Sequence, residues 1–129
     1  MTLVDSNVLL DLATDDPDWA DWSVAALEDA ALRGPLFVND VIFAEISVRL
    51  SRIEDVETFL HAAGAGLLAM PRPALFLAAK AFSHYRKAGG VRTGVLPDFF
   101  IGAHAAISGM PLLTRDPKRY RAYFPTVTL

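Results

Sequence analysis

The chain has 129 residues, of which 53% are hydrophobic and 21% are charged, a balance typical of one compact folded domain and not of a disordered segment. It contains no cysteine, which excludes disulfides and cysteine-based zinc sites. The formal net charge of -3 gives no global attraction to nucleic acid, so such binding would need a local basic patch or bridging metal ions.

The sequence carries no pattern for export or for membrane insertion. Asp5 and Asp11 stand where a signal peptide would have a basic segment followed by an apolar run. The longest apolar stretch, GAGLLAM, is broken by glycines and is far shorter than the roughly 20 residues that span a bilayer. We therefore expect one domain over residues 1–129, in the cytoplasm and without a membrane span.

The first half of the chain alternates short apolar strands with helices. A buried strand is predicted at Thr2–Val4, followed by a helical turn or two. The Asp and Pro residues of TDDPDWADW then open a helix that ends at Gly34 and Pro35. A second strand, LFVND, leads into a helix that is capped by Asn39 or Asp40.

The second half continues this alternation. A helix is predicted over Glu54–Ala63, closed by the glycines that follow, and the next strand is LLAMP. PALFLAAKAFSHYRKAGG is predicted to be helical, VRTGVL to be a loop, and a further helix runs from Pro97 to Gly109. PLLTRD is predicted to be a strand that runs into a charged turn, and TVTL a final short strand.

This order of elements predicts the fold class. Strands that alternate with helices favour a central, mainly parallel sheet, because each parallel pair needs a crossover connection. We therefore predict an α/β fold in which helices cover both faces of the sheet, a three-layer α/β/α sandwich. In open parallel sheets of this kind, ligands bind outside the carboxyl ends of the strands.

Four acidic residues occupy positions where a solvated side chain is not expected. Asp5 follows TLV and Asp116 follows PLLTR, so both would project from one edge of the sheet if their strands are neighbours. Glu45 shares a helical stripe with apolar residues, and Asp98 lies in the first turn of its helix above another such stripe. Taken singly, Asp5 and Asp116 are also typical of turns, and Asp98 of a helix cap. Glu45 could pair with Arg49.

Taken together, the four acids indicate a metal site. Carboxylates gathered at one edge repel one another, and burial strengthens the repulsion. Mg²⁺ or Mn²⁺ would offset it, since these hard ions prefer carboxylate oxygens and retain several waters. Such a site can orient a metal-bound water for attack on a phosphodiester and can stabilise the leaving oxygen.

The sequence resembles PIN-domain ribonucleases, and among them the toxins of VapBC toxin–antitoxin pairs. The matching segments are VDSNVLLDL, VNDVIFAEI and LPDFFIGAHAAISGMPLLTRD, which together span nearly the whole chain in the family's order. The last segment is the most specific, since an Asp opens an Ala-rich helix and Gly, an apolar strand and Thr-x-Asp follow. The resemblance implies a PIN-like fold and endonucleolytic cleavage of RNA by metal-activated water, leaving a 5′-phosphate.

The resemblance also assigns residues to the site by position. Its four catalytic acids match Asp5, Glu45, Asp98 and Asp116. The Mg²⁺ or Mn²⁺ ion would be held by three of them, namely Asp5, Asp98 and Asp116. Three polar residues would support the carboxylates, namely Ser6, Asn7 and Thr114. Asn7 stands two places after the first acid, and Thr114 matches a hydroxyl residue that can hydrogen-bond a carboxylate.

Basic and aromatic residues near the predicted site are candidates for RNA contacts. The basic candidates are Arg92, Arg115, Lys118 and Arg119. Tyr120 and Tyr123 could stack on a base. A charged run after a strand is also typical of a solvated turn, and this alternative stays open. His104 has no second ligand at metal spacing, so we expect it to pack in the protein or to lie at its surface.

The resemblance further implies two protein partners, a cognate antitoxin and a second copy of the chain in a homodimer. Trp19 and Trp22 have two interpretations. Core packing of an amphipathic helix is favoured, because tryptophans three residues apart usually bury together. The alternative is an apolar groove that a helix of the antitoxin fills.

Two other functions stay open at this point. A haloacid-dehalogenase-like phosphatase also begins with an apolar strand and an Asp, but it needs a second Asp two residues later, where this chain has Asn7. A non-catalytic binding module would use the acidic cluster only to dock an arginine of a partner. Assays with RNA and with a small phosphate monoester separate the phosphatase from the nuclease.

Overall fold

A computed structural model describes residues 1–91 and 94–129 of the chain. Its sheet has four parallel strands in the order β3-β2-β1-β4. The strands are β1 Thr2–Val4, β2 Leu36–Val38, β3 Ala65–Leu67 and β4 Leu112–Leu113. Leu3 of β1 pairs with Phe37 on one side and with Leu112 on the other. The predicted parallel sheet is therefore confirmed.

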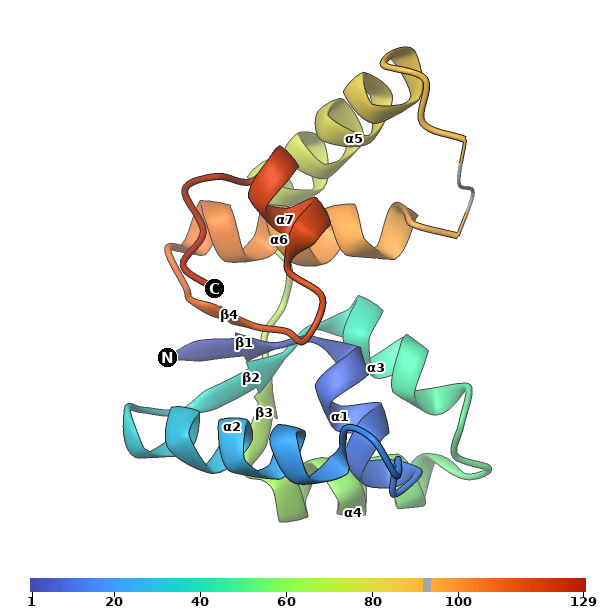
Figure 1. Cartoon of the computed structure of the whole chain (residues 1–129), viewed down its shortest axis with the longest axis vertical. Helices are drawn as coiled ribbons and strands as arrows, with labels where there is room; N and C mark the ends of the chain where they lie inside the picture. Colours follow the sequence, from blue (N-terminus) through green and yellow to red (C-terminus); the bar gives the residue numbers. More distant parts are fainter. Residues whose placement is uncertain (92–93) are drawn as a thin grey trace.

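Helices cover both faces of this sheet (Figure 1). In the described residues they are α1 Ser6–Ala13, α2 Ala20–Leu32, α3 Asp40–Ser47, α4 Ile53–Ala63, α5 Arg72–Lys87, α6 Leu96–Ser108 and α7 Lys118–Tyr123. In Figure 1, α1, α2 and α4 lie on one side of the sheet and α5, α6 and α7 on the other, while α3 stands beside the carboxyl ends of the strands. The predicted three-layer α/β/α sandwich is confirmed. Among the residues described here, no helix is long and apolar enough to cross a membrane.

The core is continuous across the sheet. Leu3 and Val38 on the strands and Ile42 on α3 are fully buried. On the other face, Gly102 of α6 lies directly against the ring of Phe124, and a Cβ atom at this glycine would overlap the ring carbon Cδ2. This close approach requires glycine, and it brings the end of α7 against α6.

Asn39 starts α3 in the way the sequence predicts. Its side-chain oxygen accepts a hydrogen bond from the Ile42 backbone N–H at 2.9 Å. Its amide nitrogen lies 3.1 Å from Nδ1 of His104 on α6, whose side chain is only 1% exposed. Burial lowers the pKa of the His104 ring. His104 therefore packs in the core, which confirms one of the two placements predicted for it.

The third strand begins earlier than predicted. The sequence places a strand at LLAMP, whereas β3 is Ala65–Leu67. Gly64 adopts a left-handed conformation with φ of 72° and ends α4, so the chain enters the sheet immediately after it. Gly66 then packs in the strand against the ring of Phe37 on β2. The glycines predicted to close the helix thus belong partly to the strand.

The C-terminal segment also differs from its prediction. The predicted strand PLLTRD is only two residues long, and the charged turn after it is the helix α7. Tyr120 and Phe124, four residues apart, are buried and give this basic segment its apolar face. TVTL is not a strand; its contact with the sheet is a hydrogen bond from the Leu112 N–H to the Thr128 carbonyl oxygen at 2.8 Å.

The tryptophans at the start of α2 do not bury in the core, which makes the favoured prediction wrong. Trp19 is 38% exposed and Trp22 is 43% exposed, and their rings meet edge to face with centroids 5.8 Å apart. The buried residues of α2 are Ser23, Leu27 and Ala30. Two of these are small, which lets α2 pack closely on α1 through this face.

Candidate active site

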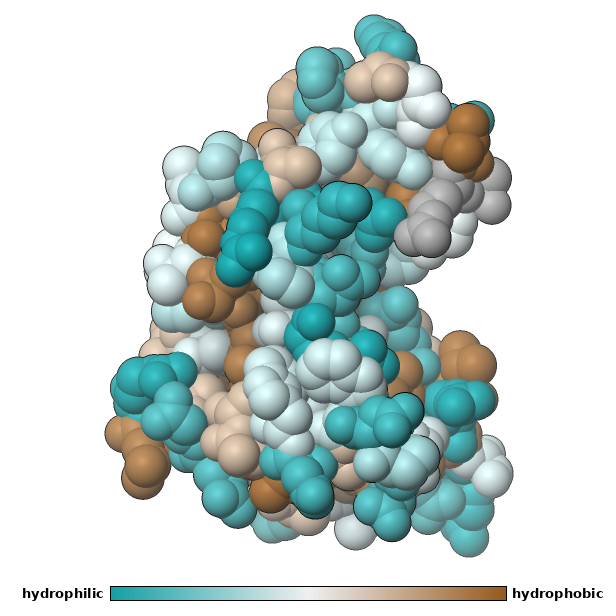
Figure 2. Space-filling model, in the orientation of Figure 1, coloured by the Kyte–Doolittle hydropathy of each residue, from teal (hydrophilic) through white to brown (hydrophobic). Residues whose placement is uncertain are grey.

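The carboxyl edge of the sheet brings together residues from both ends of the chain. β1 and β4 are parallel neighbours, so Asp5 and Asp116 follow their strands at the same edge, as predicted. The Asp5 backbone N–H donates to the Leu113 carbonyl oxygen at 2.9 Å and thereby fixes this meeting. Figure 2 shows the surface hollowed on the side where the strands end, between the α5–α7 half and the remainder.

Asp5 is the buried centre of this edge, with only 4% of its surface exposed. Its Oδ2 accepts hydrogen bonds from the Thr114 hydroxyl at 2.9 Å and from the Tyr120 hydroxyl at 3.0 Å. Burial raises the pKa of Asp5 to about 6, and the nearby charge of Asp98 adds to the rise, while the Thr114 and Tyr120 hydrogen bonds lower it. Ionisation of Asp5 thus has a cost that its own hydrogen bonds only partly offset.

Glu45 of α3 is half-buried, and Ser6 contacts both its carboxylate and that of Asp5. The Ser6 hydroxyl donates to Glu45 Oε1 at 2.9 Å and lies 3.4 Å from Asp5 Oδ1. Burial raises the pKa of Glu45, and the charges of Asp5 and Asp98 raise it further, whereas the Ser6 hydrogen bond lowers it. Ser6 therefore links two of the predicted acids.

Asp98 projects from the first turn of α6 and is bound by an arginine. Arg119 Nη1 donates to Asp98 Oδ2 at 2.5 Å, and the arginine and aspartate side chains are 19% and 32% exposed respectively. Burial raises the pKa of Asp98, Arg119 lowers it, and the charge of Asp116 raises it. The residue before α6 is Val95, and no side-chain hydrogen bond caps this helix. Asp98 is therefore not the N-cap residue, but it stands in the first turn, where the helix dipole also favours a carboxylate.

Thr114, which directly follows β4, connects the end of this strand to the end of β1. Its hydroxyl donates to Asp5 and accepts from the side-chain amide of Asn7 at 3.2 Å and from the Asp116 backbone N–H at 3.1 Å. Asp116 itself is exposed to solvent. Asn7 Oδ1 also lies 3.5 Å from the Arg115 backbone nitrogen. Asn7 and Thr114 thus belong to the hydrogen-bond network around Asp5, and their role in supporting a metal site stays a prediction.

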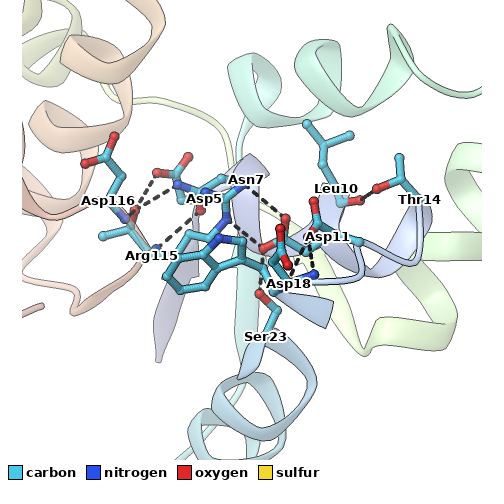
Figure 3. Close-up of polar contacts among 12 residues, drawn as sticks. Asp5, Asn7, Leu10, Asp11, Thr14, Asp18, Ser23, Arg115 and Asp116 are labelled. Carbon is cyan, nitrogen blue, oxygen red and sulfur yellow. Dashed lines mark hydrogen bonds and ion pairs between the residues drawn. The ribbon is translucent and has the colours of Figure 1, made fainter. Parts of the chain in front are cut away.

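Arg115 lies beside this edge and is held by Asp11 of α1 (Figure 3). Its Nε and Nη2 atoms donate to the two Asp11 carboxylate oxygens at 2.8 and 3.1 Å. Asp11 is 2% exposed and also accepts from the Ser23 hydroxyl at 2.8 Å. The Arg115 guanidinium lies 5.1 Å from the centroid of the Trp19 ring. Arg115 is a predicted RNA contact, but two of its nitrogen donors thus bind the buried carboxylate of Asp11.

The remaining predicted RNA contacts have mixed outcomes. Lys118, Arg119 and Tyr123 line a cleft of about 360 Å³ beside Asp116. Tyr120 is only 2% exposed, so the prediction that it stacks on a base is wrong; its hydroxyl group serves Asp5 instead. Arg92 lies outside the described residues.

Sequence reasoning missed three interactions at this site. They are the Tyr120 hydrogen bond to Asp5, the Arg119 ion pair with Asp98 and the bidentate Arg115–Asp11 pair. The four-residue spacing of Tyr120 and Phe124 was the available signal that Tyr120 faces inward. The two ion pairs left no such signal, because many acids and arginines in the chain could have been partners.

The acids fit a metal ion by their chemistry more than by their present arrangement. Within residues 1–91 and 94–129, no group of three or more acidic or histidine side chains is arranged to hold one. The donor chemistry does fit, because Asp5, Asp98 and Asp116 offer only oxygen ligands, as Mg²⁺ and Mn²⁺ prefer. Burial first, and the charge of a neighbouring acid second, raise the pKa values of Asp5 and Asp98, and a bound cation would offset this cost of ionisation. The ligand set therefore fits, although Asp5 and Asp98 are engaged by donors of the chain itself.

The family model of the PIN domain matches residues 2–125. The chain belongs to the PIN domain family. This membership removes support for the dehalogenase-like phosphatase, whose general acid is in any case replaced by Asn7. A comparison with curated protein sequences finds no match.

Several solved structures with the same fold come from toxin–antitoxin complexes. A chain of VapBC2 from Rickettsia felis, bound to a promoter DNA fragment, is 16% identical with a TM-score of 0.73, covering 99% of this PIN domain and 96% of that chain. A chain of a toxin–antitoxin complex from Klebsiella pneumoniae is 19% identical with a TM-score of 0.67, and the match covers 100% of this chain and 97% of that chain. A chain of VapBC-1 from nontypeable Haemophilus influenzae is 15% identical with a TM-score of 0.72, and the match covers 98% of this chain and 94% of that chain. At these identities the similarity establishes a shared fold.

Proposed function

We propose that this PIN domain is an endoribonuclease dependent on Mg²⁺ or Mn²⁺ and the toxin of a type II toxin–antitoxin pair. Membership in the PIN family supports a nuclease, and the fold shared with chains of toxin–antitoxin complexes supports a toxin. One observation carries the proposal. The Asp5 carboxylate is buried at the carboxyl edge of the sheet, and burial together with the nearby charge of Asp98 raises its pKa to about 6.

Asp5, Asp98 and Asp116 would hold the ion. When bound, it supplies an activated water for in-line attack on phosphorus and stabilises the leaving oxygen. The two hydrogen bonds to Asp5 Oδ2 orient that carboxylate and favour its ionised form. The Oε1 atom of Glu45 accepts a hydrogen bond from Ser6, and its other carboxylate oxygen would take up a proton in the reaction.

RNA would reach these acids along the cleft that α7 lines. Lys118 and Arg119 supply positive charge there, which offsets the repulsion between the acids and the RNA backbone. Tyr123 lines the same cleft and presents a ring on which a base could stack. Arg92 and the remaining donors of Arg115 are also proposed to contact phosphates.

The protein partners belong to the same proposal. An antitoxin is supported by the toxin–antitoxin complexes in which similar folds occur. The exposed Trp19 and Trp22 rings are the apolar side chains that we propose the antitoxin covers, since the core does not. A homodimer and a cytoplasmic location are proposed on the resemblance alone.

The decisive experiment incubates the purified protein with RNA and Mg²⁺ or Mn²⁺, with and without a chelator, and maps the cleaved ends. We expect metal-dependent internal cuts that carry 5′-phosphates, and their loss in Asp5→Asn. Asp55→Asn is the matched control, because Asp55 is an exposed acid on α4, outside the elements that supply Asp5, Glu45, Asp98 and Asp116. Full cleavage by a folded Asp5→Asn protein would contradict the proposal. Absence of cleavage by every variant, with antitoxin binding intact, would favour the non-catalytic binding module.

A further inference from the structure

We propose that Arg119 is an internal counter-cation, which holds Asp98 in the metal-free protein and must release it when a divalent cation binds. The inference rests on the proposed function, because it assigns to a residue of this chain the control of that same metal site. It adds a competition between two cations for one carboxylate, which neither the sequence nor the family resemblance indicates.

The geometry of the pair supports this role. Arg119 Nη1 lies 2.5 Å from Asp98 Oδ2, a charge-assisted contact between α7 and α6. Four-fifths of the arginine side chain is buried, so solvent competes for it only weakly. Its guanidinium also lies 6.0 Å from the centroid of the Tyr85 ring on α5, within reach of a cation–π attraction. Arg119 is thus held in place from two sides.

The arrangement of the acids is consistent with such a competition. Asp98 influences the pKa of both Asp5 and Glu45, so it lies within electrostatic reach of each. Yet no group of three acids in the described part of the chain is arranged to hold an ion. One oxygen of Asp98 is occupied by Arg119, and a divalent cation at the same carboxylate would repel the guanidinium. Metal binding and the ion pair therefore oppose each other.

The displaced guanidinium has a defined place to act. Arg119 and Lys118 line the same cleft beside Asp116, and the proposed RNA path runs through it. An arginine freed from Asp98 regains the donors that bind a phosphate in a planar, bidentate manner. Occupation of the metal site would thus increase the positive charge available to the substrate, so the two events would be coupled.

The competition is tested by Mn²⁺ affinity, measured by calorimetry on metal-free protein without RNA. We expect Arg119→Gln to bind Mn²⁺ about three- to tenfold more tightly than the unaltered protein, because no partly buried ion pair then has to be broken. Arg121→Gln is the matched control: it removes the same charge from an exposed position on the opposite side of α7. Its affinity is expected to change by less than about twofold.

A second measurement uses the unaltered protein and so does not depend on how a variant folds. The arginine Nε–H signals are followed by NMR during titration with Mg²⁺. We expect the Arg119 signal to shift with saturation of the site, and the Arg121 signal to stay in place. An unshifted Arg119 signal at saturation, or equal Mn²⁺ affinity of the Arg119→Gln and Arg121→Gln proteins, overturns this inference and leaves the proposed function standing. Failure of the unaltered protein and Arg119→Gln to bind either ion overturns both.

Discussion

The Tyr120 hydroxyl donates a hydrogen bond to Asp5 Oδ2 at 3.0 Å, although 115 positions separate the two residues in the sequence. Asp5 leaves the first strand and Tyr120 lies on the last helix, so the contact joins the two ends of the fold at the candidate active site. Burial and the charges of Asp5 and Asp98 raise the pKa of the Tyr120 hydroxyl. The Tyr120 hydroxyl therefore stays protonated and donates to Asp5, and this hydrogen bond lowers the pKa of the Asp5 carboxyl.

Replacement of Tyr120 by phenylalanine tests this dependence. The Tyr120 hydrogen bond lowers the pKa of Asp5, so its loss should raise that pKa above about 6. NMR titration of the Asp5 carboxyl carbon in metal-free protein measures the change. Tyr123→Phe is the control, since Tyr123 packs against Phe99 and is not a donor to Asp5 in the described contacts. An Asp5 pKa equal in Tyr120→Phe and the unaltered protein would contradict the assignment.

Asp5 should also make the metal-free fold less stable as pH rises. Its pKa is about 6 in the folded protein against an ordinary value of 3.8, so the folded state binds more protons between these two values. The free energy of unfolding should therefore fall across this interval, by about 3 kcal/mol from this group alone. Asp5→Asn removes that contribution, so urea denaturation should show the variant gaining on the unaltered protein between about pH 4 and pH 7. Parallel pH profiles of the two proteins would refute this.

The Arg115–Asp11 pair should contribute far more to stability than an exposed pair. Arg115→Ala leaves the buried Asp11 carboxylate with Ser23 as its one side-chain donor among the described residues. We expect this loss to cost about 2 to 4 kcal/mol of unfolding free energy. Arg33→Ala breaks the Arg33–Asp29 pair, whose side chains are 65% and 64% exposed, and should cost less than about 1 kcal/mol. Urea denaturation of both variants gives the comparison. Equal losses would show that the buried network does not act as described.

The contact between α6 and Phe124 predicts a cost for one added methyl group. Gly102→Ala places Cβ within the space of the Phe124 ring, and we expect a loss of about 1 to 3 kcal/mol despite the better helix propensity of alanine. Gly94→Ala, where nothing lies within 4 Å of the added atom, should stay within about 0.5 kcal/mol. Thermal unfolding measures both. A Gly102→Ala protein as stable as the unaltered one would mean that the ring moves aside freely.

Features encoded by local chemistry were predictable from the sequence. The sequence predicts Asn39 or Asp40 as a helix cap because short polar side chains precede an apolar helical stripe, and Asn39 is the residue that caps α3. The order of strands places Asp5 and Asp116 at one edge because neighbouring parallel strands end on the same side of a sheet. These inferences need only neighbouring residues and the order of strands. Their metal-binding and catalytic roles stay predictions.

Features that depend on partner choice were not predictable. Arg115 and Asp11 are 104 positions apart, and nothing in either neighbourhood selects the other. The exposure of Trp22 depends on whether another element covers it, and the small residues Ser23 and Ala30 took the buried face instead. Basic residues surround Tyr120 in the sequence, so the pattern of the six-residue helix α7 does not indicate that it has an apolar face. In each case the outcome was decided by tertiary packing.

The amide of Asn39 has a consequence for the spacing of the acids. The Asn39 side-chain oxygen accepts a hydrogen bond from the Ile42 N–H, so the Asn39 NH₂ group faces Nδ1 of His104. Nδ1 must then accept a hydrogen bond, and the neutral His104 ring carries its proton on Nε2. An aspartate of the same shape would offer the ring no donor and force a different tautomer. Asn39 begins the helix of Glu45, and His104 lies on the helix of Asp98. One carboxamide therefore joins the two helices whose acids the proposed chemistry needs at a fixed separation.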